Sequence, residues 1–386
     1  MKSFLPPLDH SLLFLLLLLI LFGTVMLYSA SSPEKSGGPE WGGKMLMRRA
    51  AQVFVGMGLL VMLAFLDLRI IRRLAPWAWG ISLVLLIAVL FLPGNRGTKG
   101  WLWGQSIQVA EAARVSMLVF MAALLADFKD RKDFRGRYLW PILVLAASVI
   151  PIVLQPDYGS ALALSFCGGF LLMAAGLPKR IILAGLLLLA LVSVGGYQFS
   201  SRIQSRVDST YRVDVTQLED DTYQLGQSLI GIGAGGLRGE GPGKSRQKSF
   251  FLPDHHTDFI FAIVGEELGI WGALGVIVLL GLLIWRMMRI AFAQSEAFPR
   301  NLAAGMASMI FVYAGLNLSV NLGLFPLTGL PLPFFSHGGS ALVMNMAGVG
   351  LVLSVARQSQ DRSGRRRIFR REQEPAMENL YREPRP

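Results

Sequence analysis

Long apolar runs with few charges constrain this 386-residue chain more than any other feature of its sequence. A helix needs about 20 consecutive apolar residues to cross a membrane, and the first such run reads SLLFLLLLLILFGTVMLYSA. Charged residues make up 16% of the chain, against roughly 25% in soluble domains. The sequence therefore predicts an all-α polytopic membrane protein. Its first run is too long for a signal-peptide core and is expected to be a retained span.

Ten apolar runs are each predicted to form a membrane-spanning helix. They cover about residues 11–30, 50–66, 77–92, 106–126, 139–155, 159–177, 181–198, 259–285, 301–323 and 338–356. The loops that carry RIIRR, KDRKDFRGR and PKR fall on one side of this arrangement, and cytoplasmic loops are enriched in Lys and Arg. Both termini are then cytoplasmic, and one large extracytoplasmic loop, residues 199–257, lies between helices 7 and 8.

The domain division follows from these runs. Residues 1–357 are predicted to form the transmembrane domain, in which QLGQSLIGIGAG of the large loop forms a short helix. Residues 358–386 are expected to be a basic, disordered cytoplasmic tail with affinity for anionic lipid. The net charge of +12 lies in short loops and in this tail, where membrane topology accounts for it, so we expect no nucleic-acid partner.

Ionisable side chains within spans are costly and usually face a cavity or a partner. The predicted topology places Glu111, Arg114, Asp157 and Asp258 near the outer ends of their helices, which indicates a water-accessible cavity open to the outside. Glu111 and Arg114 are three residues apart and share a helix face. They form either an ion pair that locks helix packing or a site in which Arg114 meets an anionic ligand. Asp157 is either a helix N-cap or a cavity residue, and the two roles are compatible.

The stretch FLPDHHTDFIFAIVGEELG places several ionisable groups in front of an apolar run. Asp258 lies at the boundary of that run, where a carboxylate is a candidate general base. His255 and His256 could hold a metal with Asp254, but adjacent residues of an extended segment point apart, so we predict no protein-held metal. Of two further carboxylates in the run, Glu266 and Glu267, at least one is expected to bond a neighbouring helix rather than to react.

The segment GGLRGEGPGKS in the large loop resembles a phosphate-binding loop but lacks the glycine spacing of one. Its cations, with two that follow, form a basic, Gly-rich strip: Arg238, Lys244, Arg246 and Lys248. They are either solvated loop charges or a site for an anionic headgroup.

Five motifs, in order over about residues 9–357, together resemble one family. They read DHSLLFLLLLLILFGTVMLYSAS, GTKGWLWGQSIQVAEAARV, QPDYGSAL, the stretch from YQLGQSLIGIGAG to HTDFIFAIVGEELG, and GLPLPFFSHGGSALV. The chain resembles the SEDS proteins, the FtsW and RodA polymerases of the bacterial cell wall, and its large loop is more similar to FtsW.

The resemblance implies a peptidoglycan glycosyltransferase that polymerises lipid II at the outer face of the inner membrane, here in cell division. It implies Asp258 as the residue that activity requires and a class B penicillin-binding transpeptidase as partner, beside other divisome or elongasome membrane proteins. Glu111, Arg114 and Asp157 match sensitive family positions. The chain has Gly100 where an Arg is usual, with Lys99 beside it, and RRAAQ in place of an Arg-Gln pair.

We therefore expect Asp258 to act as general base, and the leaving polyprenyl pyrophosphate to require cations nearby. The candidates for substrate binding are Arg48, Arg49, Lys99, Glu111, Arg114, Asp157 and Lys248. No tightly bound cofactor is expected, although a divalent cation, Mg or Mn, is compatible with the reaction. The alternatives are a RodA-like polymerase for elongation, a lipid II flippase, and a non-catalytic divisome scaffold.

Overall fold

The computed structural model of the chain describes residues 8–31, 39–92, 100–102, 107–131, 133–199, 201–211, 221–250 and 257–380. Each predicted apolar run is helical: α1 (His10–Ala30), α2 (Pro39–Phe65), α3 (Leu68–Ala88), α4 (Val109–Asp127), α5 (Phe134–Leu154), α6 (Tyr158–Ala174), α7 (Lys179–Phe199), α11 (Ile260–Phe292), α12 (Ala297–Asn321) and α13 (Gly339–Leu380). Among the described residues, eight of these helices are long and apolar enough to cross a membrane, and α6 is a shorter apolar helix. The protein is thus a multi-pass helical membrane protein, and the count of ten spans stays a prediction.

Shorter elements fill the connections. They are η1 (Val89–Phe91), the antiparallel pair β1 (Trp101–Leu102) and β2 (Ile107–Gln108), α8 (Ser201–Tyr211), α9 (Asp221–Gly235) and α10 (Gln247–Phe250). In the hairpin, Trp101 pairs with Gln108 and Leu102 with Ile107. The short helix expected at QLGQSLIGIGAG is confirmed as part of α9.

Several helices begin before, or end after, the apolar run that predicted them. The side chain of Asp67 accepts a hydrogen bond from the Arg69 N–H at 2.8 Å and caps α3, so the predicted loop 67–76 is mostly helix. α13 likewise continues to Leu380, through the tail that we expected to be disordered. Hydropathy detects where a helix meets lipid, whereas caps and helix-forming polar residues decide where it ends.

The core forms around α12, which packs against α4, α6, α11 and α13. Met306, Met309 and Ile310 of α12 are completely buried. Large apolar side chains such as Phe54, Trp77 and Trp271 remain exposed on the outer helices, as expected for a surface that faces lipid.

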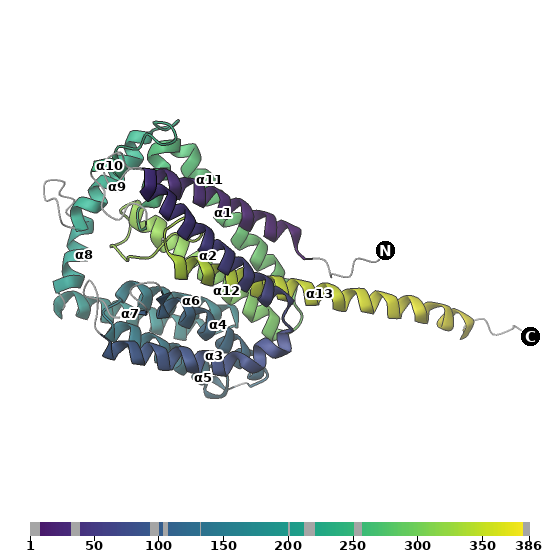
Figure 1. Cartoon of the computed structure of the whole chain (residues 1–386). Coiled ribbons are helices and arrows are strands. Elements are labelled where there is room, and N and C mark those ends of the chain that lie inside the picture. The colour runs from purple at the N-terminus through teal and green to yellow at the C-terminus, as the bar shows by residue number, and fades with distance from the viewer. Residues whose placement is uncertain are drawn as a thin grey trace, which may run out of the picture.

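Alternating helix directions bring the starts of α2, α4, α6, α11 and α13 together with the ends of α1 and α12. Hydrogen bonds join these ends: Gln108 before α4 bonds Asp157 before α6 and Ser340 in α13, and Asn321 in α12 bonds Asp258 before α11. We call this end of the bundle the site end. In Figure 1, α9 and α10 lie at this end, and α13 runs out of the bundle at the other.

Candidate active site at one end of the bundle

Asp258 is held in place through its backbone. It lies two residues before α11, and its carbonyl oxygen accepts hydrogen bonds at 2.9 Å from the side-chain amides of Asn317 and Asn321. The side-chain oxygen of Asn321 also accepts from the Ala262 N–H at 3.2 Å, which satisfies one of the open donors at the start of α11. The two asparagines thus fix the position from which the half-buried Asp258 side chain extends.

The segment between α12 and α13, residues 322–338, lies beside both Asp258 and the first turn of α6. A Cβ on Gly159, in the first turn of α6, would lie 2.0 Å from the carbonyl oxygen of Thr328. A Cβ on Gly329 would lie 3.9 Å from a carboxylate oxygen of Asp258. The Asn317 amide donates to the Leu330 carbonyl at 2.8 Å. The same stretch of this segment, 328–330, therefore lies against the first turn of α6, which Asp157 caps, and beside Asp258.

Asp157 is the N-cap of α6, which is one of the two roles predicted for it. One carboxylate oxygen accepts from the Ser160 N–H at 3.1 Å, and the other accepts from the Gln108 side-chain amide at 3.2 Å. The Gln108 N–H donates to the Ser340 hydroxyl at 3.0 Å. Asp157 is thereby linked to the starts of α4 and α13, and substrate binding by this carboxylate stays a prediction.

Glu111 and Arg114 form an ion pair in the interior of the bundle. Their nearest oxygen and nitrogen are 2.6 Å apart, and both side chains are almost completely buried. The Arg114 guanidinium also donates to the Asn345 side chain at 3.0 Å and lies 3.7 Å from the centre of the Tyr313 ring. This geometry agrees with the predicted packing role, because it joins α4 to α12 and α13. Contact of Arg114 with a ligand stays a prediction.

The two adjacent arginines of α2, Arg48 and Arg49, differ in their surroundings. Arg49 is completely buried and donates to the carbonyl oxygens of Phe334 and Ser336, 3.1 Å away in the case of Ser336. Arg48 is exposed. Neighbouring residues on a helix point about 100° apart, so Arg49 holds the segment before α13 and Arg48 keeps an accessible charge.

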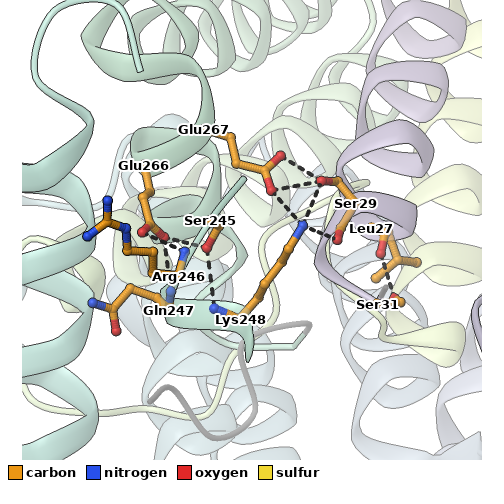
Figure 2. A network of polar contacts seen from close by, with 9 residues as sticks. All are labelled: Leu27, Ser29, Ser31, Ser245, Arg246, Gln247, Lys248, Glu266 and Glu267. Carbon is orange, nitrogen blue, oxygen red and sulfur yellow. Dashed lines mark hydrogen bonds and ion pairs between the residues drawn. The ribbon is translucent and has the colours of Figure 1, made fainter. Parts of the chain in front are cut away.

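Lys248 lies in a buried polar network with Glu266 and Glu267 (Figure 2). Its ammonium donates to Glu267 at 3.0 Å and to the Ser29 carbonyl at 2.9 Å. The expected bond of at least one glutamate to a neighbouring helix is confirmed, because Glu267 accepts from the Ser29 hydroxyl of α1. Glu266 accepts from backbone and hydroxyl groups of residues 245–247. The ammonium of Lys248 therefore serves a contact within the chain, and a role in binding substrate stays a prediction.

Some predicted residues lie outside the described part of the chain. Lys99 is among them, as are Asp254, His255 and His256. Within the described ranges, no three His, Cys, Asp or Glu side chains come together in a way that could hold a metal ion.

Sequence reasoning missed Asn317 and Asn321. The signal was present, since two amides four residues apart in GLNLSVNLG occupy one face of an apolar helix. Polar residues inside spans commonly bond across helices, so uncharged amides within an apolar run are site candidates as much as ionisable groups are.

Comparison with known proteins identifies the class and then the family. The fold and site define a helical membrane protein whose polar residues converge at one end of the bundle. A sequence model of the FtsW/RodA/SpoVE family of cell cycle proteins matches residues 9–361, and the chain belongs to this family.

Similar proteins and solved structures support the same family assignment. A probable peptidoglycan glycosyltransferase FtsW of Geobacter sulfurreducens is 33% identical over 361 residues, which covers 90% of this chain and 95% of the relative. The same-named protein of Trichlorobacter lovleyi is 35% identical, covering 90% and 93%. A chain from a peptidoglycan synthase complex superposes with a TM-score of 0.74 at 31% identity, covering 91% and 98%. Thermus thermophilus RodA gives 0.67 at 30% identity, covering 91% and 97%.

Proposed function

We propose that this chain polymerises lipid II into glycan strands, with Asp258 as the general base. It is a peptidoglycan glycosyltransferase of the FtsW type, and relatives that bear this name match it over nine-tenths of its length. The observation that carries the assignment of the base is the anchoring of Asp258: two buried asparagines hold its carbonyl, and its side chain is half-buried at the end of the bundle.

In the proposed reaction, Asp258 accepts the proton of the 4-hydroxyl group on the acceptor sugar. That oxygen bonds to the anomeric carbon of a second lipid-linked disaccharide, and the bond from this carbon to the pyrophosphate oxygen breaks. Polyprenyl pyrophosphate leaves with the bonding electron pair. A positioned base contributes about 10²- to 10⁴-fold to such a step.

Negative charge develops on the leaving pyrophosphate, so cations nearby stabilise the transition state. Arg48 is our first candidate, because it is exposed, whereas Arg49, Arg114 and Lys248 have partners within the chain. Lys99 stays a candidate from the sequence alone. We expect no tightly bound cofactor. A divalent cation, Mg or Mn, is compatible with the reaction, since substrate phosphates are common ligands of Mg²⁺.

We place the protein in the bacterial inner membrane with ten spans and both termini in the cytoplasm. Eight helices meet the length and apolarity of a span, and α6 and α7, of 17 and 21 residues, supply the other two. The site end then faces outward with loop 199–257, where lipid II presents its sugars.

A class B penicillin-binding transpeptidase is the proposed partner, beside other divisome membrane proteins. The support is the similarity to a chain from a complex described as coordinating polymerisation and crosslinking. The FtsW-like relatives favour cell division over a RodA-like role in elongation.

The test uses purified full-length protein in detergent, with and without its transpeptidase partner, supplied with labelled lipid II. Glycan polymer is expected from the wild type, and Asp258→Asn should make none while expressing and folding normally. Polymer formed in detergent cannot come from a flippase. Full synthesis by Asp258→Asn would remove Asp258 from the mechanism.

A further inference from the structure

The chain that carries Asp258 closes on itself through a buried ion pair. Lys248, ten residues before Asp258, bonds Glu267, nine residues after it. The Lys248 and Glu267 side chains are 3% and 0% exposed. Asp258 therefore lies near the middle of a closed loop of chain whose ends are fixed to each other.

Two adjacent glutamates of α11, Glu266 and Glu267, bind residues 245–248 in different ways. Glu266 accepts from the Arg246 N–H at 2.9 Å and from the Gln247 N–H at 3.4 Å, and also from the Ser245 hydroxyl. Glu267 binds the Lys248 ammonium instead (Figure 2). The Glu266 carboxylate thus binds two backbone N–H groups and one hydroxyl group of residues 245–247, and the Glu267 carboxylate binds the Lys248 side chain.

The glycines around this closure let the two backbones approach closely. The Glu240 N–H donates to the Glu266 carbonyl at 2.9 Å, and the Gly241 N–H donates to the Glu267 carbonyl at 3.0 Å. A Cβ on Gly239 would lie 2.3 Å from the Glu267 carbonyl oxygen. Gly239 has a φ of +76°, a conformation that glycine adopts without strain. Residues 239–248 are therefore docked along the first turns of α11.

The end of α1 is part of the same closure. The Ser29 hydroxyl donates to the Glu267 carboxylate at 2.6 to 2.8 Å, and the Ser29 carbonyl accepts from Lys248 at 2.9 Å. The three side chains satisfy one another in a site from which water is largely excluded. Buried ion pairs of this kind hold one geometry strongly, because separating them leaves an unpaired charge.

We propose that Ser29, Lys248, Glu266 and Glu267 form a clamp that positions Asp258 for glycan polymerisation, with Lys248 and Glu267 as its main positioning residues. Fixing both ends of a short loop restricts the residues between them. The clamp holds both flanks of this loop, while Asn317 and Asn321 hold the carbonyl of Asp258 within it. This inference rests on the proposed function and assigns the clamp no contact with substrate.

The test compares steady-state polymerisation by the purified full-length chain. Lys248→Met and Glu267→Gln are each expected to lower kcat about 100-fold, because a displacement of about 1 Å at a reacting group can cost that much. KM should change little, since the interaction lost is one that aids the transition state alone.

A matched control, the ion pair of Arg286 and Asp9, lies at the opposite end of α1 and α11. Arg286 of α11 donates to Asp9, the N-cap of α1, at 3.1 and 2.6 Å. Arg286→Met removes an ion pair between α1 and α11 far along the helix from Asp258, and should leave kcat unchanged. An equal loss of kcat in Arg286→Met would overturn the proposal, because the effect would then come from general packing of α1.

A second variant and a second measurement keep the test decisive. The neutral pair, Lys248→Met with Glu267→Gln, leaves no lone buried charge and is expected to fold. Its peptides across 240–250 should exchange amide hydrogens faster than those of the wild type. Wild-type kcat or wild-type exchange in this double variant would overturn the clamp. Lack of polymer from the wild type would instead count against the proposed function, and the exchange measurement would still decide on the clamp.

Discussion

Glu111 and Asp258 are carboxylates at the same end of the bundle, yet the structure holds them in opposite ways. Glu111 is fixed through its carboxylate, which pairs with Arg114 in the interior. Asp258 is fixed through its carbonyl oxygen by two amides, and its side chain is half-buried. A carboxylate used as an anchor stabilises helix packing. A residue anchored by its backbone can present its carboxylate to a substrate.

The strongest test of this difference in anchoring moves the carboxylate of residue 258 and keeps its negative charge. Asp258→Glu adds one methylene group and shifts the carboxylate by more than 1 Å, so we expect about 100-fold lower kcat with no loss of thermal stability. Lipid II polymerisation and a thermal unfolding curve, both in detergent, check the two parts. Wild-type activity in Asp258→Glu would show that the anchored backbone does not define the reacting position.

At Glu111 the expected loss is in stability. Glu111→Gln leaves the buried Arg114 without its anion and should cost about 3–5 kcal/mol, which thermal unfolding measures as a lower Tm. Glu111→Gln combined with Arg114→Met removes both charges and should recover much of the loss. A Glu111→Gln protein with wild-type Tm and no activity would move this pair into the reaction instead.

Some features of the fold and the site could be predicted from the sequence, and others could not. The positions of the helices were predictable because charge-free runs of sufficient length have few other structures. The convergence of Glu111, Asp157 and Asp258 at one end followed from alternating helix directions. The contacts of Lys248 were not predictable, because its partners Ser29 and Glu267 lie in other elements. The choice between Arg48 and Arg49 depended on helix rotation, which hydropathy does not fix.

The backbone anchor of Asp258 can also be weakened at Asn317, one of the two asparagines that bind its carbonyl oxygen. Asn317→Leu should leave the carbonyls of Asp258 and Leu330 without this donor, at a cost of about 1–3 kcal/mol, and should lower kcat about tenfold. Asn345→Leu is the matched change beside Glu111 and Arg114, and it should lower Tm and leave kcat unchanged. Equal effects of the two changes on kcat would erase the distinction between the two anchors.

A smaller effect is expected where the segment before α13 touches α6. Gly159→Ala would place a Cβ 2.0 Å from the Thr328 carbonyl oxygen, so the segment beside Asp258 must shift at a cost of about 1–3 kcal/mol. Gly169→Ala, in the same helix, meets nothing within 4 Å and should be neutral or stabilising by up to about 1 kcal/mol. Tm and kcat of both variants are measured together, and matching values would show that the contact does not matter.

Asp67 gives the smallest effect, because it is an exposed carboxylate that only caps a helix. The hydrogen bond from the Arg69 N–H, aided by the Arg69 charge, lowers the pKa of the Asp67 carboxyl below its ordinary value. A lowered pKa means that the stabilisation is present above the unfolded value, about 3.9, and is lost as the pH falls through the folded value. Asp67→Ala should therefore lower Tm slightly at pH 7 and less at pH 3. Asp67→Asn keeps a good cap without the charge, so its Tm should differ little from that of the wild type at pH 7. An equal loss from Asp67→Ala at both pH values would show that ionisation of this carboxylate contributes nothing to the cap.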